Sequence, residues 1–247
     1  MIEKNQTYYP IIIVEGMDNS GKDFVIDIIN KLIREYNDGH VYGYNVMLNI
    51  HCTKPIYDSS MSKEEYKQMY IAENSYLMKY VLQSVQTNSG IILNRSYFSD
   101  YVYGQMYRNI DEESEKQIQN NIFDSMVDAI LFNQLLNPDT NYHYISLKPD
   151  RKVIEQCLYN SVLYIQLHTP IDFLITNDDG KSQSKNNKDL IIKEDLLYKE
   201  NYNKQIYFSK YMLETTEMRI VDQYGYKKLV WKNKETLERE LKKVIFR

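Results

Sequence analysis

A short apolar run, a glycine-containing loop and a helical pattern follow one another near the start of this 247-residue chain, and this feature most constrains its fold. Residues 11–14 are Ile-Ile-Ile-Val, which is typical of a strand buried on both faces of a parallel sheet. Gly16 and Gly21 bracket four variable residues, Lys22 follows, and apolar residues recur at helical spacing over 23–36. Backbone N–H groups in such a loop, at the amino end of a helix, bind phosphate. The stretch therefore predicts a phosphate-binding loop.

The residues of this loop suggest a nucleoside triphosphate and a metal. Lys22 can reach the terminal phosphates as a point charge. The next position normally offers a Ser or Thr hydroxyl to Mg²⁺, but here it is Asp23, which can ligate the cation, pair with Lys22 or cap the helix. We expect ATP with Mg²⁺, and Asp23 as the metal ligand. The residues expected around the phosphates are Gly16, Asn19, Ser20, Gly21, Lys22 and Asp23.

Two further acidic residues belong to the loop. Asp18 lies inside it and Glu15 at its mouth. A carboxylate among phosphates is unfavourable unless it faces a sugar hydroxyl or a metal, so both residues are candidates for one of these two contacts. A side chain that stabilises the turn is the alternative for each.

Composition excludes several other classes of function. The formal net charge of −4 argues against a general affinity for nucleic-acid backbones. Cys52 and Cys157 are far apart and lack metal-ligand spacing, so we expect neither a disulfide framework nor a zinc site. No signal peptide or membrane-spanning run is recognisable, so we expect a cytoplasmic protein without a membrane partner.

Strand-like runs alternate with helical patterns along the chain. We expect strands at 11–14, 42–51, 91–93, 142–147 and 218–221 and a helix over 193–213, whereas 163–167 and 171–175 are ambiguous between strand and helix. Residues 177–189 contain no hydrophobic residue, which predicts a mobile loop. The alternation predicts an α/β fold with three layers: a five-stranded parallel sheet, helices on both faces and a mobile lid.

The carboxyl ends of these strands should carry the ligand site. Arg95 follows the third strand, where its guanidinium can hold a phosphate at two points, or can form a surface ion pair. Lys181, Lys185 and Lys188 can close over phosphates as part of a lid, with solvated loop charges as the alternative.

Several segments together resemble thymidylate kinase and its nucleoside monophosphate kinase relatives, which have the P-loop NTPase fold. These segments are VEGMDNSGKD, LNRSYFSDYVYGQ, the polar loop before YKENYNKQIYFSKY, and MRIVDQ before a terminal helix. Their order and spacing match over most of the chain. The resemblance implies one domain over 1–247, with a lid or insert at about 156–192, and is consistent with a homodimer.

The resemblance also assigns roles to residues. It implies that Asp18 meets the sugar of the acceptor, and that Asn94, Arg95, Ser99 and Tyr103 line the monophosphate and base pocket. Glu15 and Asn74 complete the expected substrate-binding set, and Lys22, Arg95 and Asp18 are the expected catalytic residues. The chain departs from the family at Asp23, which replaces Ser or Thr, at Asn94, which replaces Asp, and at Asn74, which replaces an arginine.

We therefore expect transfer of the γ-phosphoryl group of ATP, with Mg²⁺, to a nucleotide or nucleoside, with a deoxynucleoside monophosphate as the favoured acceptor. Two alternatives stay open. One is a kinase that acts on a modified nucleotide within DNA. The other is a catalytically inactive nucleotide-binding protein, which the replacements at Asp23 and Asn94 favour.

Overall fold

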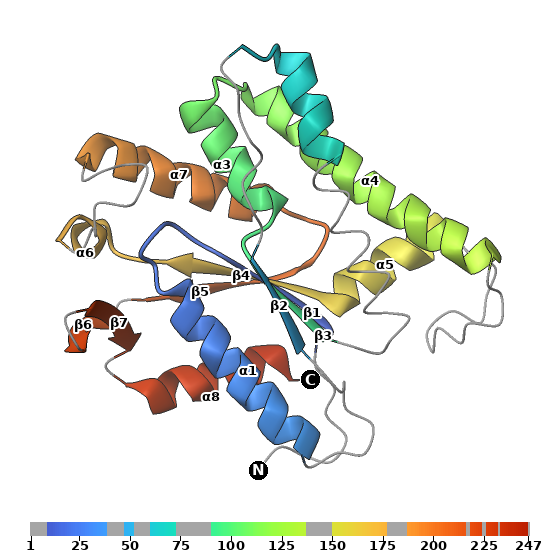
Figure 1. The fold of residues 1–247 in the computed structure, drawn as a ribbon. Coiled ribbons are helices and arrows are strands. Elements are labelled where there is room, and N and C mark those ends of the chain that lie inside the picture. Colours follow the sequence, from blue (N-terminus) through green and yellow to red (C-terminus); the bar gives the residue numbers. More distant parts are fainter. Residues whose placement is uncertain are drawn as a thin grey trace.

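Five parallel strands form the centre of the protein. The computed structural model describes residues 9–38, 47–51, 60–72, 90–136, 150–176, 187–215, 218–223, 226–231 and 233–246. The strands are β1 (Ile11–Glu15), β2 (Met47–His51), β3 (Gly90–Asn94), β4 (Val162–His168) and β5 (Ser209–Glu214). They lie in the order β2-β3-β1-β4-β5, with every neighbouring pair parallel (Figure 1). The predicted five-stranded parallel sheet is confirmed.

Helices cover both faces of this sheet (Figure 1). One face packs against α1 (Lys22–Asp38) and α8 (Lys234–Ile245), and the other against α3 (Tyr97–Tyr107), α4 (Glu112–Leu136) and α5 (Arg151–Ser161). Strand β1 shows why both faces are apolar. Ile12 and Val14 contribute to the first layer, and Ile11 and Ile13 to the second, because successive side chains of a strand point to opposite faces.

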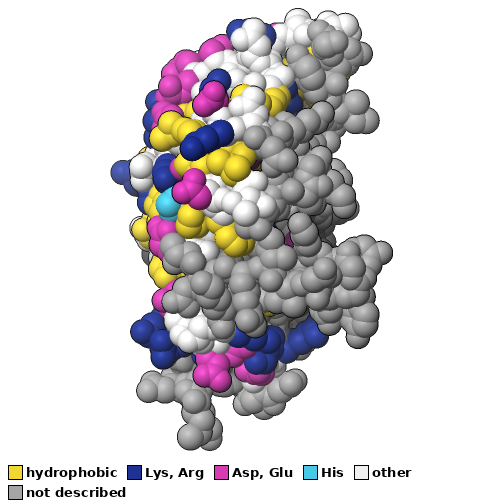
Figure 2. Space-filling model, turned by 90° about the vertical axis from the view of Figure 1, so that its left-hand side faces the viewer, with side chains coloured by type: hydrophobic (Ala, Val, Ile, Leu, Met, Phe, Trp, Pro, Cys, Tyr) yellow, Lys and Arg dark blue, Asp and Glu magenta, His cyan; other side chains and the backbone are white. Residues whose placement is uncertain are grey.

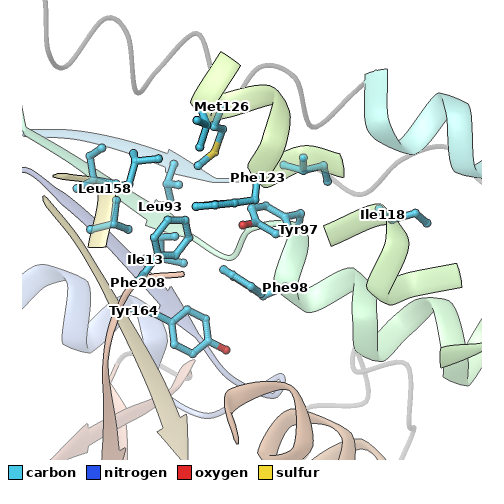
Figure 3. Packing of buried hydrophobic residues seen from close by; sticks show 14 of the residues in the cluster. Ile13, Leu93, Tyr97, Phe98, Ile118, Phe123, Met126, Leu158, Tyr164 and Phe208 are labelled. Atoms are coloured by element: carbon cyan, nitrogen blue, oxygen red, sulfur yellow. The ribbon is translucent and has the colours of Figure 1, made fainter. Parts of the chain in front are cut away.

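Aromatic rings dominate the layer between the sheet and α3 to α5 (Figure 3). The ring of Phe98 lies edge-on to that of Tyr164, with 4.9 Å between centroids, and Phe123 stacks on Tyr207 at 4.0 Å. Each such pair adds about 0.5–1.5 kcal/mol beyond the burial of its surface. The contact of Phe98 with Tyr164 holds α3, which carries several candidate site residues, against the sheet, and the contact of Phe123 with Tyr207 holds α4 against the residues before β5.

The two ambiguous segments are one strand and one helix. Residues 163–167 belong to β4, and residues 171–175 to α6 (Ile171–Thr176). Strand β4 lies between β1 and β5 and all but its last residue is buried. Residues 162–168, which fall within the lid or insert expected at about 156–192, thus supply an inner strand, and the lid or insert itself stays a prediction.

The helix expected over 193–213 ends earlier. Helix α7 (Lys188–Lys204) stops at Gln205, and β5 then forms the edge of the sheet. The ammonium of Lys210 donates hydrogen bonds to the last carbonyl groups of the helix region, those of Tyr202, Asn203 and Gln205, and so satisfies them. This cap separates the helix from the strand.

The fifth strand of the parallel sheet is thus β5, and the expectation that residues 218–221 supply it is wrong. They lie in β6 (Met218–Gln223), which pairs antiparallel with β7 (Tyr226–Trp231) in a separate two-stranded sheet. A hairpin joined by so short a connection is antiparallel, whereas parallel strands need a crossover.

Other expectations fall partly or wholly outside the described residues. The strand expected at 142–147 lies outside them, and so does most of the polar loop expected at 177–189. Residues 63–72 are helical, and Ser62 and Glu65 form a capping box, in which each side chain accepts a hydrogen bond from the other residue's backbone N–H. Among the described helices, none has the length and apolar character needed to cross a membrane.

Candidate active site

The predicted phosphate loop lies between β1 and α1, at the carboxyl end of the central strand. Gly16, Asn19 and Gly21 have φ angles of 152°, 61° and 83°, in the region that favours glycine. A Cβ atom on Gly16 would lie 2.7 Å from Oγ of Ser20. Gly16 is therefore required by both its conformation and the close approach of the loop. The Ser20 hydroxyl is buried inside the turn and has no hydrogen-bond partner among the described residues.

The side chain of Lys22 folds back over this loop. Its Nζ donates to the carbonyl oxygens of Gly16, at 3.0 Å, and of Met17, at 2.7 Å. Burial, followed by the charge of Arg95, lowers the pKa of Lys22 to about 7. The two carbonyl groups thus offset only part of the cost of removing the Lys22 ammonium from water. An anion bound at the loop would stabilise the charged form of Lys22.

Glu15 ties the loop to α3. Its carboxylate is fully buried and accepts hydrogen bonds from the backbone N–H of Ser96 at 2.6 Å, from the Ser96 hydroxyl at 2.8 Å, and from the Ser99 hydroxyl. Burial raises the pKa of Glu15, against the lowering effect of the Ser99 hydrogen bond. These contacts fix the start of α3 against β1, while a role of Glu15 in binding substrate stays a prediction.

Arg95 is the centre of a second group, which we call the Arg95 cluster: Asp18, Arg95, Ser99, Tyr103, Glu194 and Tyr198. The Arg95 guanidinium pairs with the Asp18 carboxylate, and its Nη1 donates to Oη of Tyr198 at 2.8 Å and to Oγ of Ser99 at 3.3 Å. It also lies over the ring of Tyr103, 5.4 Å from the centroid. The Arg95 side chain is only 8% exposed, whereas that of Asp18 is 30% exposed.

Asn94 and Asp23 meet beside the loop. Nδ2 of Asn94 donates to Oδ1 of Asp23 at 2.7 Å, and the Oδ1 atom of Asn94 is buried without a hydrogen-bond partner in the described part of the chain. Oxygen atoms of this kind suit Mg²⁺, which usually takes one or two carboxylates together with phosphate oxygens and water. The described residues contain no group of three or more His, Cys, Asp or Glu side chains that could hold a metal alone. The Asp23–Asn94 pair therefore fits a magnesium ion shared with a nucleotide.

Glu194 is a member of the Arg95 cluster that the sequence did not suggest. It lies on α7, is 2% exposed, and accepts a hydrogen bond from Oη of Tyr103 at 3.2 Å. Burial and the nearby charge of Asp18 raise the pKa of Glu194 to about 7. A signal for Glu194 was present in the sequence, because it stands at helical spacing with other residues of the buried face of α7. These residues are Ile191, Tyr198 and Asn201.

Most of the predicted site residues come together at the carboxyl end of the sheet. Asn74, Lys181 and Lys185 lie outside the described residues, and Lys188 begins α7. Strands β4 and β5 lead toward the side of the molecule that carries α6, α7 and the β6–β7 hairpin. Figure 2 shows that side, where acidic, basic and hydrophobic side chains are interspersed over the described part.

A cavity of about 550 Å³ lies elsewhere, between α4 and α5. Its lining includes Tyr159, just before β4, and Ile206 and Tyr207, just before β5. These positions precede the amino ends of the strands, whereas the loop and the Arg95 cluster follow the carboxyl ends. The cavity is thus separate from the candidate site.

Comparison with known proteins gives no match to a family model and none to a curated protein sequence. Among the solved structures that resemble this one are three nucleotide-binding proteins or kinases. The YorR protein of Bacillus subtilis, in complex with phosphorylated GDP, is 14% identical, with 83% of this chain and 85% of that chain covered and a TM-score of 0.45. Thymidylate kinase from Candida albicans is 15% identical, with 86% of each chain covered and a TM-score of 0.46. Thymidylate kinase from Ehrlichia chaffeensis is 13% identical, with 95% and 96% covered and a TM-score of 0.49.

Proposed function

We propose that the protein transfers the γ-phosphoryl group of ATP, with Mg²⁺, to a nucleotide or nucleoside acceptor. The observation that carries this proposal is the loop from Gly16 to Lys22. It joins a buried central strand to the amino end of a 17-residue helix, and its lysine side chain is already folded over the loop. Such a loop offers N–H groups, the positive end of a helix and an ammonium to one chain of phosphates.

The neighbouring residues support the rest of the proposal. Asp23, held by Asn94, would bind the magnesium ion, which supplies neutralisation of charge on the phosphates when it is bound. Asp18 and Arg95 lie at the loop on the side of α3, where an acceptor would approach. Catalysis by such a site rests on positioning and on stabilisation of charge rather than on a covalent intermediate.

Transfer of a labelled γ-phosphate tests this function. The purified protein is incubated with labelled ATP, Mg²⁺ and a panel of deoxynucleosides, their 5′-monophosphates and DNA oligonucleotides. We expect transfer to at least one acceptor, and a loss of about 10²–10³-fold in kcat for Lys22→Ala. Lys116→Ala, on the exposed face of α4, is the matched control and should leave the rate unchanged.

The other outcomes separate the alternatives. Calorimetric binding of ATP without transfer to any acceptor would favour an inactive nucleotide-binding protein. Transfer confined to oligonucleotides would favour a kinase that acts on DNA. Absence of ATP binding would contradict the proposed phosphotransferase and both of these alternatives.

A further inference from the structure

Three side chains accept hydrogen bonds from the guanidinium of Arg95. It pairs with Asp18, donates to Tyr198 and Ser99, and lies over the ring of Tyr103. A residue that grips a phosphate at two points must present free N–H groups to it. The Arg95 side chain is only 8% exposed, and in this arrangement its guanidinium orients the Asp18 carboxylate.

The exposed polar group of the Arg95 cluster is therefore an anion. Among the described residues, Arg95 is the only cation in a salt bridge with Asp18, and it contacts Oδ1 alone. The Asp18 side chain is 30% exposed, and no described residue forms a hydrogen bond with its second oxygen. That oxygen can accept a proton or a hydrogen bond.

The groups behind Asp18 are also suited to a neutral ligand. Glu194 adds a second carboxyl group to the cluster, and Tyr103 already donates to it. The hydroxyl of Tyr107, whose ring stacks on that of Tyr103 at 6.0 Å, is buried and lacks a hydrogen-bond partner within the described part of the chain. A phosphate dianion in these surroundings would meet carboxylates, whereas a hydroxyl group or a base would find acceptors and an aromatic surface.

From this arrangement we propose that the acceptor presents a hydroxyl group, as a nucleoside does, and not a phosphate to the γ-phosphate of ATP. The proposal rests on the phosphotransferase function proposed above and narrows it. It departs from the deoxynucleoside monophosphate that the sequence favours.

The reaction then needs a base, and Asp18 is placed to be one. The acceptor oxygen forms a bond to the γ-phosphorus, while the bond between that phosphorus and the bridging oxygen breaks and its electron pair stays on ADP. The hydroxyl proton passes to the free oxygen of Asp18. A phosphate acceptor is already ionised and needs no such proton transfer, so the base would be idle with it.

The wild-type protein tests the choice of acceptor without any substitution. Initial rates are measured with matched pairs of deoxynucleoside and 5′-monophosphate at equal ATP and Mg²⁺. We expect kcat/KM for the nucleoside to exceed that for its monophosphate by about tenfold or more, since like charges oppose binding of the monophosphate. A preference for the monophosphates would overturn this inference while leaving the proposed phosphotransferase intact. No transfer to nucleosides, monophosphates or DNA oligonucleotides would instead count against the phosphotransferase itself.

A pair of substitutions tests the base. Asp18→Asn should lower kcat with the nucleoside by about 10²-fold or more, with ATP affinity by calorimetry retained. Asp18→Glu should recover part of the loss, and Asp27→Asn, an exposed position on α1, is the matched control. An unchanged kcat in Asp18→Asn would overturn the assignment of Asp18.

Discussion

The side-chain amide of Asn94 donates a hydrogen bond to the carboxylate of Asp23, with 2.7 Å between Nδ2 and Oδ1. The bond joins the end of β3 to the first turn of α1. A carboxylate in place of Asn94 would set two like charges in contact, whereas the amide orients Asp23 and leaves its other oxygen for a ligand. Two residues at which the sequence departs from the thymidylate kinase pattern that it resembles are therefore in direct contact.

Removing either partner should weaken binding of the metal. In the presence of ATP we expect Asp23→Ala and Asn94→Ala each to reduce affinity for Mn²⁺, used as a probe for Mg²⁺, by about 10–100-fold. Electron paramagnetic resonance of free Mn²⁺ measures this without reference to activity. Asp27→Ala, one turn further along α1 and exposed, is the control. Equal affinities in all three variants would contradict a metal site at Asp23.

ATP binding should be accompanied by uptake of a proton. The pKa of Lys22 is about 7 in the free protein because of burial and Arg95, and a bound phosphate anion raises it. At a pH between the pKa of Lys22 in the free protein and its pKa in the ATP complex, Lys22 is neutral before ATP binds and charged afterwards. Because binding then takes up a proton, ATP affinity falls as pH rises above about 7. Calorimetry of ATP binding near pH 8, repeated in buffers of different ionisation enthalpy, measures the number of protons taken up per ATP.

Lys22→Arg separates this uptake from other ionisations. Arginine stays charged throughout, so its variant should take up about one proton fewer per ATP than the wild type. Identical uptake in the two proteins would show that Lys22 is already charged before ATP binds.

The position of the loop between β1 and α1 could be predicted because its signal is local. A buried strand, two glycines and a lysine at fixed spacing determine both the loop and the start of α1, and the structure has them where the sequence places them. Strand β5 carries no such signal. Of its six residues only Leu213 is buried, so no alternation distinguishes this edge strand from the helix before it.

The partners within the site could not be predicted for a different reason. Arg95 and Asp18 are 77 residues apart, and Glu194 reaches them only because α7 packs on α3. Their contacts depend on the packing of whole helices, which a single sequence does not specify. The sequence thus identified Arg95 as a site residue but did not identify Asp18 as its partner in an ion pair.

Loss of the Glu15 carboxylate should destabilise the protein. Glu15→Ala leaves the buried N–H and hydroxyl of Ser96 and the hydroxyl of Ser99 without their acceptor. Each unsatisfied group costs about 1–3 kcal/mol, and serine hydroxyls can rotate toward other partners, so we expect a loss of about 3 kcal/mol. Urea unfolding measures it, with the exposed Glu113→Ala on α4 as control. If Glu15→Ala lowered the free energy of unfolding no more than Glu113→Ala does, water would be replacing the carboxylate as the hydrogen-bond acceptor.

Another buried carboxyl group lies away from the loop between β1 and α1, where α3, α4 and residues 63–72 meet. Glu115 on α4 is 1% exposed, and its Oε1 atom has no hydrogen-bond partner among the described residues. Gly104 makes room for it, since a Cβ atom there would overlap Oε1. The charged groups that face Glu115 are Asp100, Arg108 and Asp111, and Arg108 is itself paired with Asp100.

The protonation of Glu115 should make stability depend on pH. Burial and then the charge of Asp100 raise the pKa of Glu115 from 4.5 to about 8. Below about pH 4.5 the group is protonated in the folded and unfolded states alike. As pH rises toward 8, the unfolded state releases the proton and the folded state keeps it, so the free energy of unfolding falls by up to about 1.4 kcal/mol per pH unit. Glutamine does not titrate, so Glu115→Gln removes the pH dependence that Glu115 contributes. In urea unfolding at several pH values between about 5 and 8, the free energy of unfolding of this variant should decline less steeply than that of the wild type. Because Asp100, Glu15 and Glu194 also have raised pKa values, some decline remains in the variant. Parallel curves for the two proteins would mean that Glu115 is ionised in the folded state and stabilised by Arg108.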